Sequence, residues 1–369
     1  MKKLGIYIHI PFCIKKCGYC DFYSYEKVKK NYVNYLISEI SIYLKKNFFK
    51  KYIIDSLYIG GGTPSILSYK DYSRLFSFLK KYLPLNKKIE ITIEFNPEHI
   101  NVETLTLFKS IGINRFSFGI QSTNKELLKI IGRGTIIKNY EYIVEKVRES
   151  NLPNISLDFL FAIPSQKEED IIKDFNFIDE INPHHISWYQ LTFYKNTHLY
   201  NKLKKGVIKY PEEENILKLS EFIKRELVKR GFHHYEVSNY AKKGFECLHN
   251  LKYWQLSYYL GFGESACGFY NRTFYENYRG KEYYNAIKNK IFPYKVKKVY
   301  SIDEYFFLQL MMGLRLKKGI KISSLVKNPL KNEKIKEFLN DDILLQKNGY
   351  LRISEKFFPL LDSILTEIM

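Results

Sequence analysis

The sequence has no long apolar run. No stretch approaches the ~20 residues that a helix needs to cross a bilayer, and the start, MKKLGIYIHIPF, lacks the apolar core and small-residue cleavage site of a secretion signal. Proline and glycine are also scarce, at 11 and 19 of 369 residues, whereas hydrophobic residues make up 45% and aromatic residues 17%, which excludes a disordered or fibrous chain. We therefore expect a globular, cytoplasmic protein.

Cysteine is scarce too, and its placement is uneven. The five cysteines are an odd number in a chain without a recognisable secretion signal, which argues against a disulfide framework and for reduced thiols. Three of them, Cys13, Cys17 and Cys20, fall in the segment CIKKCGYC with the spacing C-x3-C-x2-C, and no fourth cysteine follows. The other two, Cys247 and Cys267, lie more than two hundred residues away.

Three kinds of site use clustered cysteines. A structural zinc ion needs four ligands, commonly in two pairs. A thioredoxin-like redox site needs only two cysteines, so Cys13 would be surplus. A [4Fe–4S] cluster bound by three thiolates keeps one iron without a protein ligand, and such an open position is a place for chemistry. The spacing favours the cluster over the zinc ion and the redox pair.

Acidic residues are in the minority. The 59 Lys and Arg stand against 39 Asp and Glu, which gives a net charge of +20. Such an excess is compatible with a nucleic-acid or anionic-membrane partner. The lysines, however, are spread over nearly every segment, and no nucleic-acid-binding motif is recognisable. We expect a diffuse basic surface and no nucleic-acid partner.

Short β-branched and aromatic runs alternate with amphipathic stretches, the pattern of repeated βα units on a parallel sheet. Helices are expected between the strands, among them 33–46 and 72–83, and a long helix is expected at 211–231, after the sixth strand. Six units predict an α/β fold, an open, partial (β/α)6 barrel whose active site lies at the C-terminal ends of the strands. The predicted strands are 5–11, 56–65, 89–97, 115–122, 155–164 and 184–193.

Beyond about residue 295 the texture of the sequence changes. The segments SIDEYFFLQLMMGLRLKKGIKISSL and NGYLRISEKFFPLLDSILTEI predict a small, mainly helical domain with a short hairpin. We therefore expect a barrel over residues 1–235, a connecting region over 236–295 and a C-terminal domain over 296–369.

The cysteine loop after the first strand and the glycines that end the second, GGGTP, resemble the radical SAM superfamily. Glycines at a strand edge let backbone groups approach a ligand closely, where a Cβ would prevent it. The resemblance implies a [4Fe–4S] cluster held by Cys13, Cys17 and Cys20, whose open iron binds the amino and carboxylate groups of S-adenosylmethionine. It also implies contacts to S-adenosylmethionine from Tyr7, Tyr19, Gly61, Gly62, Thr63, Glu94, Gln121, Arg133, Asp158 and Thr192. Each of these residues also has an ordinary alternative, such as a helix cap or a solvated charge.

Four further segments resemble one branch of the superfamily, the HemW family of radical SAM haem chaperones. They are CDF at 20–22, YEVSNYA at 235–241, CLHNLKYW at 247–254 and GFGESA at 261–266. The related oxygen-independent coproporphyrinogen oxidases usually carry a fourth cysteine two residues after the third, where this chain has Phe22. Two departures from the family pattern, Thr135 in place of His and Ala162 in place of Gly, leave the contacts of the pocket open.

The H-N-x-x-Y-W motif within 247–254 supplies a candidate haem ligand. The resemblance implies His249 as an axial ligand to haem iron, while Tyr253 and Trp254 offer flat apolar area and the basic excess could pair with propionates. Cys247 is an alternative soft ligand. A histidine among aromatic residues is also a common structural arrangement, and that alternative stays open.

The resemblance implies a protein that binds haem and passes it to an acceptor protein. The alternative is oxidative decarboxylation of coproporphyrinogen III, so whether the chain is an enzyme stays open. A third candidate function, modification of a nucleic acid by a radical SAM enzyme, is supported only by the net positive charge of the chain. The family also implies an electron donor such as a flavodoxin or ferredoxin, and it is compatible with peripheral association with a membrane.

Overall fold

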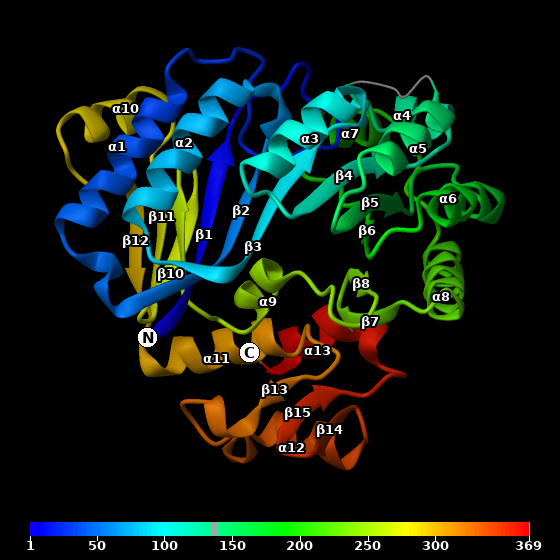
Figure 1. Cartoon of the computed structure of the whole chain (residues 1–369). Coiled ribbons are helices and arrows are strands. Elements are labelled where there is room, and N and C mark those ends of the chain that lie inside the picture. The colour runs from blue at the N-terminus through cyan, green and yellow to red at the C-terminus, as the bar shows by residue number, and fades with distance from the viewer. Residues whose placement is uncertain (135–138, 369) are drawn as a thin grey trace.

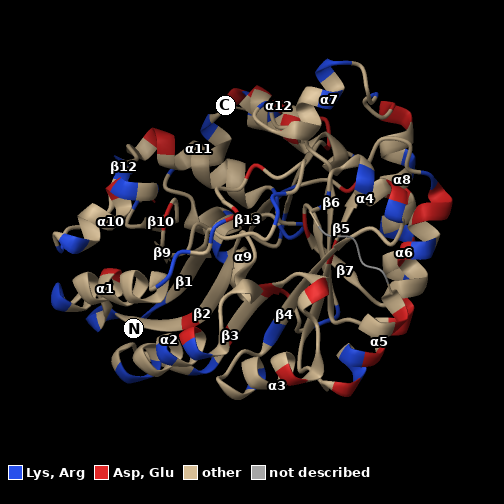
Figure 2. Ribbon diagram, turned by 90° about the horizontal axis from the view of Figure 1, so that it is seen from above, with Lys and Arg blue, Asp and Glu red and all other residues tan. Residues whose placement is uncertain are grey.

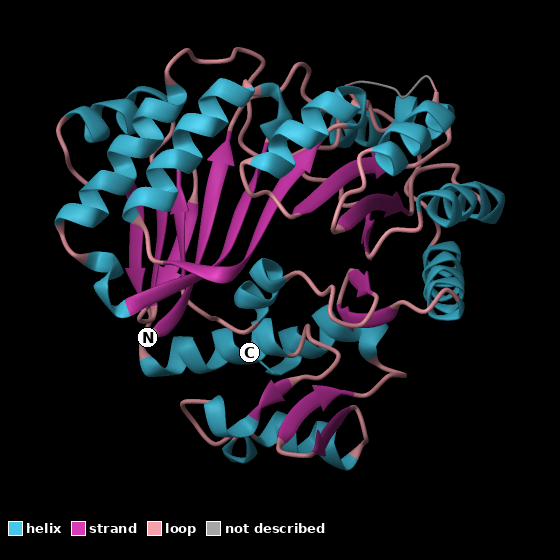
Figure 3. Cartoon of the chain, in the orientation of Figure 1, coloured by secondary structure: helices cyan, strands magenta, loops and turns pink. Residues whose placement is uncertain are grey.

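The main feature of the computed structural model, which describes residues 1–134 and 139–368, is a twelve-stranded sheet that curves into an open barrel (Figure 1; Figure 3). Six parallel strands lie side by side in sequence order and confirm the predicted partial (β/α)6 barrel. Thr135 lies outside the described residues. The six strands are β1 Lys2–Ile10, β2 Tyr52–Gly61, β3 Leu85–Phe95, β4 Arg115–Gln121, β5 Ile155–Phe161 and β6 His185–Gln190.

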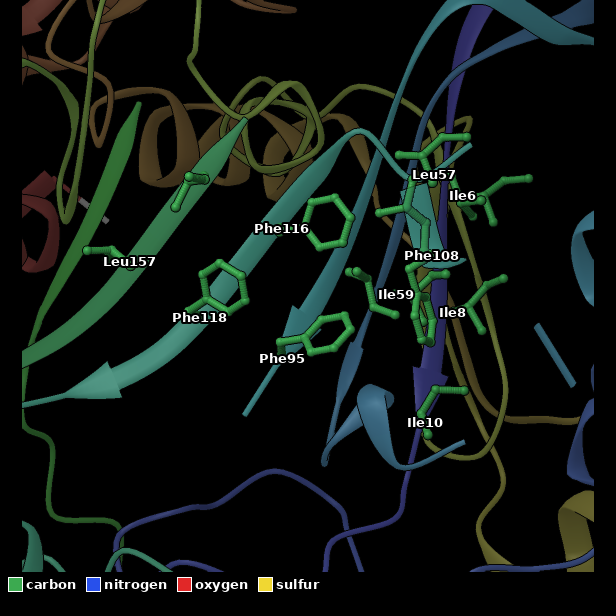
Figure 4. Packing of buried hydrophobic residues seen from close by; sticks show 14 of the residues in the cluster. Ile6, Ile8, Ile10, Leu57, Ile59, Phe95, Phe108, Phe116, Phe118 and Leu157 are labelled. Atoms are coloured by element: carbon green, nitrogen blue, oxygen red, sulfur yellow. The ribbon is translucent and has the colours of Figure 1, made fainter. Parts of the chain in front are cut away.

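Alternation along each strand decides which side chains face the helices and which face the inside of the barrel. In β1, Ile6, Ile8 and Ile10 are buried in the layer between the sheet and the helices (Figure 4). Tyr7 points to the other face, where its ring lies 6.2 Å from that of Tyr58 on β2. Full burial of one isoleucine side chain contributes about 1.5–3 kcal/mol to the stability of the fold, so this apolar face holds the sheet to the helices. The opposite face, toward the inside of the barrel, can then carry polar residues.

Helices cover the outer face of the parallel strands (Figure 1). Asn and Ser side chains begin several of them, as at Ser68, Asn101 and Asn139, by accepting a hydrogen bond from a backbone N–H of the first turn. The predicted helices at 33–46, 72–83 and 211–231 are found as α1, α2 and α8. The bounds are α1 Tyr32–Lys45, α2 Tyr69–Tyr82, α3 Val102–Ser110, α4 Lys125–Ile130, α5 Tyr140–Glu149, α6 Glu168–Ile181, α7 His198–Lys204 and α8 Glu213–Lys229.

Both ends of the sheet are extended by short strands that the sequence did not predict. Beside β6 lie β8 Asn239–Ala241 and β7 His233–Glu236, both antiparallel. Beside β1 lies β9 Tyr259–Phe262, which runs parallel to it. The antiparallel strands β10 Cys267–Tyr270, β11 Thr273–Asn277 and β12 Tyr294–Val299 follow, with α9 Leu248–Trp254 and α10 Gly280–Lys288 in the same part of the chain. Much of 236–295 is therefore part of the main sheet.

The C-terminal part has its own small core. It is mainly helical, as predicted, and contains the hairpin β14–β15 in a three-stranded sheet. Leu310, Phe338, Leu351 and Leu365 are buried in its core. Its elements are α11 Ile302–Gly313, β13 Ile320–Lys321, α12 Glu333–Asn340, β14 Leu344–Lys347, β15 Tyr350–Ile353 and α13 Leu361–Ile368.

Charged residues lie mostly on the outer helices and loops. Figure 2 shows Lys and Arg interspersed with Asp and Glu along helices such as α5, α6 and α8, while most of the barrel strands are uncharged. Among residues 1–134 and 139–368, no helix combines the length and apolar character that crossing a membrane requires.

Candidate functional site

The cysteine loop leaves the C-terminal end of β1 and is tied down at several points. The Cys13 amide donates to the Tyr25 carbonyl at 3.1 Å, so the two ends of the loop are joined. The Gly18 amide donates to the Gly132 carbonyl, and the Leu199 amide donates to the Gly18 carbonyl, both at 2.8 Å. The loop is therefore held by segments that follow β4 and β6, at the end of the barrel where a partial barrel has its active site.

Two donors point at the Cys17 sulfur. Arg133 Nη1 lies 3.4 Å from Cys17 Sγ, and the Gly134 amide nitrogen lies 3.3 Å from the same atom. Hydrogen bonds from a cation and from a backbone N–H stabilise negative charge on the sulfur. They therefore favour the thiolate, which is the form of cysteine that binds metal. Arg133 also donates from Nη2 to the Gly119 carbonyl at 2.9 Å and to Asn96 Oδ1 at 3.2 Å, so its position is fixed.

Gly62, after β2, lies against the start of the cysteine loop, where a side chain would not fit. A Cβ on Gly62 would lie 2.5 Å from the Phe12 carbonyl oxygen and 3.0 Å from Cys13 Sγ. Within the described part of the chain, no three His, Cys, Asp or Glu side chains converge as the ligands of a single metal ion do. The thiolates of a four-iron cluster stand farther apart, because irons and sulfides lie between them. Three thiols on one loop, with donors to one sulfur and a glycine against another, fit a cluster with three protein ligands.

Polar side chains from the parallel strands line the inside of the barrel beside this loop. Glu94, on β3, accepts from the Tyr58 hydroxyl at 2.9 Å and from the Gly61 amide at 3.1 Å. Burial, and after it the repulsion from the nearby Asp158 carboxylate, raise the pKa of Glu94 to about 7. Asp158, on β5, accepts from the Ser117 hydroxyl at 2.9 Å, and burial raises its pKa as well.

Most of the other predicted contacts gather around the same opening. Gln121 ends β4 with a positive φ of 69°, and a Cβ on Gly119 would lie 3.0 Å from Gln121 Nε2 and 3.6 Å from Arg133 Nη2. Thr63 is buried and its amide donates to the Phe12 carbonyl at 2.7 Å. Tyr19 lies close to Arg133, and burial raises its pKa. Thr192 differs from these residues because its side chain is exposed in the segment after β6.

Several residues that no sequence motif singled out also shape the site. Asn96 Nδ2 lies 3.4 Å from Thr63 Oγ1, in addition to its contact with Arg133. His9 Nε2 donates to the Tyr23 carbonyl at 2.8 Å, and its Nδ1 lies 3.0 Å from the Tyr7 hydroxyl. Burial lowers the pKa of His9 to about 4, so the neutral ring accepts from Tyr7. Both residues lie in segments that the resemblance already marked, His9 in IYIHIPFC and Asn96 in EFNP.

The most connected of the missed residues is Glu264, which is fully buried in the turn between β9 and β10. Its carboxylate accepts from the Tyr25 hydroxyl at 2.8 Å, from the Tyr23 hydroxyl at 3.1 Å and from the Gly280 amide at 2.7 Å. Tyr284 donates to it as well. Because Tyr23 and Tyr25 follow the last cysteine, Glu264 holds the outgoing end of the cysteine loop.

Replacing Glu264 with glutamine should loosen the cluster. The amide puts an NH2 donor where donors already converge, and an unsatisfied buried donor costs about 1–3 kcal/mol. We expect the reconstituted Glu264→Gln protein to lose iron to a chelator about tenfold faster than the wild type. Glu276→Gln is the matched control, because Glu276 contacts the half-exposed Arg279 at 3.1 Å. Equal rates of iron loss in the wild type and Glu264→Gln would contradict this role.

His249 lies at the opposite end of the barrel from the cysteines. It is on α9, whose first amides, Leu248 N and His249 N, donate to the Glu90 carboxylate at 3.0 and 3.1 Å. The His249 ring is fully buried, with Nδ1 3.0 Å from Ser56 Oγ and Nε2 2.9 Å from the Tyr253 hydroxyl. Burial lowers its pKa to about 3.

The structure therefore does not present His249 as an open ligand. Both ring nitrogens have protein partners, so ligation of haem iron would require the ring to leave them. Cys247 is also fully buried, against Glu90. Ligation of haem by His249 stays a prediction from the resemblance, and the structure does not bring this residue together with the cysteine loop.

The barrel and the cysteine loop define a radical SAM protein, and residues 7–178 match the radical SAM superfamily. The solved structure of coproporphyrinogen III oxidase (HemN) from Escherichia coli has the same fold, with a TM-score of 0.82 at 20% identity over 99% of this chain and 89% of that one. Two relatives from Buchnera aphidicola are named heme chaperone HemW. The one from subsp. Schizaphis graminum is 40% identical over 72% of this chain and 70% of its own length. The one from subsp. Acyrthosiphon pisum is 35% identical over 96% and 91%.

The chain belongs to the HemW family within this superfamily. Membership of the radical SAM superfamily implies a [4Fe–4S] cluster and S-adenosylmethionine.

Proposed function

We propose that this protein binds haem and passes it to an acceptor protein, while Cys13, Cys17 and Cys20 hold a [4Fe–4S] cluster with S-adenosylmethionine beside it. The observation that carries the proposal is the likeness to proteins named heme chaperone over almost the whole chain, including the C-terminal part. Phe22 stands where the coproporphyrinogen oxidases usually have a fourth cysteine. A cytoplasmic location, an electron donor such as a flavodoxin or ferredoxin and peripheral contact with a membrane complete the proposal.

The proposed cofactor site is the opening at the C-terminal ends of the strands. The cluster, when bound, supplies the electron for reductive cleavage of S-adenosylmethionine. Gly61 and Gly62 supply backbone that a ligand can approach, and the Glu94 carboxylate can accept from ribose hydroxyls. The other residues that we assign to this pocket are Tyr7, Tyr19, Thr63, Gln121, Arg133, Asp158 and Thr192.

The role of Glu94 predicts a pH dependence. Ionised Glu94 accepts hydrogen bonds and protonated Glu94 must give up its proton first, so affinity for S-adenosylmethionine should rise as pH increases through the pKa of about 7. Binding to the cluster-loaded protein should strengthen roughly tenfold from about pH 6 to about pH 8, measured by calorimetry. Glu94→Gln, which cannot ionise, should bind more weakly and show a flat profile. The same slope in both proteins would contradict the assignment.

Haem binding and transfer test the function directly. The cluster is reconstituted without oxygen, haem is titrated while the Soret band is recorded, and the loaded protein is mixed with an apo haem protein as acceptor. Saturable binding followed by transfer supports the proposal. Conversion of coproporphyrinogen III to protoporphyrinogen IX without specific haem binding would replace it with the oxidase activity.

A further inference from the structure

A cavity of about 560 Å³ lies between the floor of the barrel and the C-terminal part. Figure 1 shows α9 between the barrel strands and α11, with β13 below α11. The cavity is lined from both sides, by Trp254 and Leu251 of α9 and by Tyr305 and Gln309 of α11. Its volume falls in the range of ~300–1,000 Å³ that holds ligands of a few tens of atoms.

The helix that carries the H-N-x-x-Y-W motif, α9, has two faces, and the second of them lines the cavity. His249 and Tyr253 are four residues apart and point toward the barrel interior, where they contact each other and His249 also contacts Ser56. Leu251 and Trp254 are three residues apart and line the cavity. One short helix thus closes the barrel with one face and offers a tryptophan to the cavity with the other.

The walls of the cavity are aromatic and rigid. Tyr235, Tyr305 and Tyr350 line it together with Trp254. Gln309 fixes the wall beside them, because its Nε2 donates to the Ser324 carbonyl at 2.8 Å and its Oε1 accepts from the Val326 amide at 2.9 Å. Flat aromatic side chains around a preformed space favour a flat conjugated ligand.

The rim of the cavity is basic. Lys318 and Lys321 are exposed lining residues. Among the described lining residues the one acidic side chain is Glu246, and His233 Nε2 contacts its carboxylate at 2.7 Å. Two lysines at the mouth complement a ligand with two carboxylates. The described lining contains no histidine, cysteine or methionine, so recognition here does not depend on those ligands to a metal.

We infer that this cavity is where the protein binds its cargo, a flat conjugated macrocycle with two carboxylates, which lies against Trp254 with its carboxylates at Lys318 and Lys321. The inference rests on the proposed function and specifies the site for haem. It differs from ligation by His249, because the macrocycle and its carboxylates are recognised instead of the iron.

The test compares haem with metal-free protoporphyrin IX on the full-length protein with its cluster reconstituted. Binding is followed by the Soret band and by quenching of tryptophan fluorescence. We expect the two ligands to bind with affinities within about fivefold of each other. Lys318→Glu combined with Lys321→Glu should weaken both at least about tenfold. Lys45→Glu combined with Lys46→Glu is the matched control, because these exposed lysines on and after α1 give the same change of net charge.

The possible outcomes distinguish failure of the cavity assignment from failure of the proposed function. If haem binds but protoporphyrin does not, or if the Lys318/Lys321 variant binds haem like the control, the cavity is not the site and the proposed function stands. If the wild type binds neither ligand, the proposed function fails and the inference fails with it. Trp254→Phe checks placement independently of charge, because quenching that persists unchanged in this variant would also overturn the inference.

Discussion

Alanine in place of any one of Cys13, Cys17 and Cys20 should abolish the iron–sulfur cluster. Two remaining thiolates hold a four-iron cluster poorly, and in Cys17→Ala the Arg133 guanidinium and the Gly134 amide also lose the sulfur to which they donate. Iron and sulfide content of the reconstituted variants should fall to background. The visible absorbance band and the EPR signal of the reduced protein should disappear.

Cys267→Ala provides the matched control for these variants. Cys267 lies on β10, is partly exposed, and its thiol lies 3.9 Å from the Ser265 carbonyl. Its removal should leave the iron content and the EPR signal at the level of the wild type. A full complement of iron in any of the three loop variants would refute the assignment of the ligands.

Asp55→Asn should destabilise the fold more than any exposed charge substitution. Lys252 of α9 and Asp55 of β2 form an ion pair of 2.6 Å, with side chains only 7% and 12% exposed. Removing the carboxylate leaves a buried lysine without its partner, which costs about 3–5 kcal/mol. The midpoint of urea unfolding should fall accordingly, because this pair ties α9 to the barrel.

Two variants check the explanation for Asp55. Glu126→Gln removes an ion pair of similar length, 2.7 Å to Lys129, but both of its side chains are more than half exposed, so the loss should stay within about 1 kcal/mol. Adding Lys252→Met to Asp55→Asn should restore part of the stability, since no charge is then left buried. A midpoint for Asp55→Asn equal to that of Glu126→Gln would show that the buried pair does not hold α9.

These substitutions act at opposite ends of one barrel. The cysteine loop lies where β1 and β2 end, and α9 closes the end where β2 begins. Between them, the Tyr58 hydroxyl bonds Glu94 while the Tyr58 ring lies 5.4 Å from the His249 ring. The motif around His249 therefore supports the lining of the proposed cofactor pocket, independently of any ligand in the cavity on the other side of α9.

Local patterns in the sequence determined the centre of the fold. The six parallel strands could be predicted because Ile6, Ile8 and Ile10 and their counterparts repeat with the period of a strand, and because glycines and polar residues mark the strand ends. The cysteine spacing likewise predicted a cluster with three protein ligands, since spacing within one loop is a local property. Both inferences use residues that are close together in the chain.

Only the tertiary structure decided the parts that depend on distant contacts. Strands β7 to β11 have three to five residues each, too few for a periodic pattern to stand out. Glu264 meets Tyr23 and Tyr25 across about 240 positions, His249 meets Ser56 across 193, and the cavity exists only where α9 meets α11. A sequence records which side chains are available for such contacts, but their partners are chosen by the packing of the whole chain, which leaves no local pattern to detect.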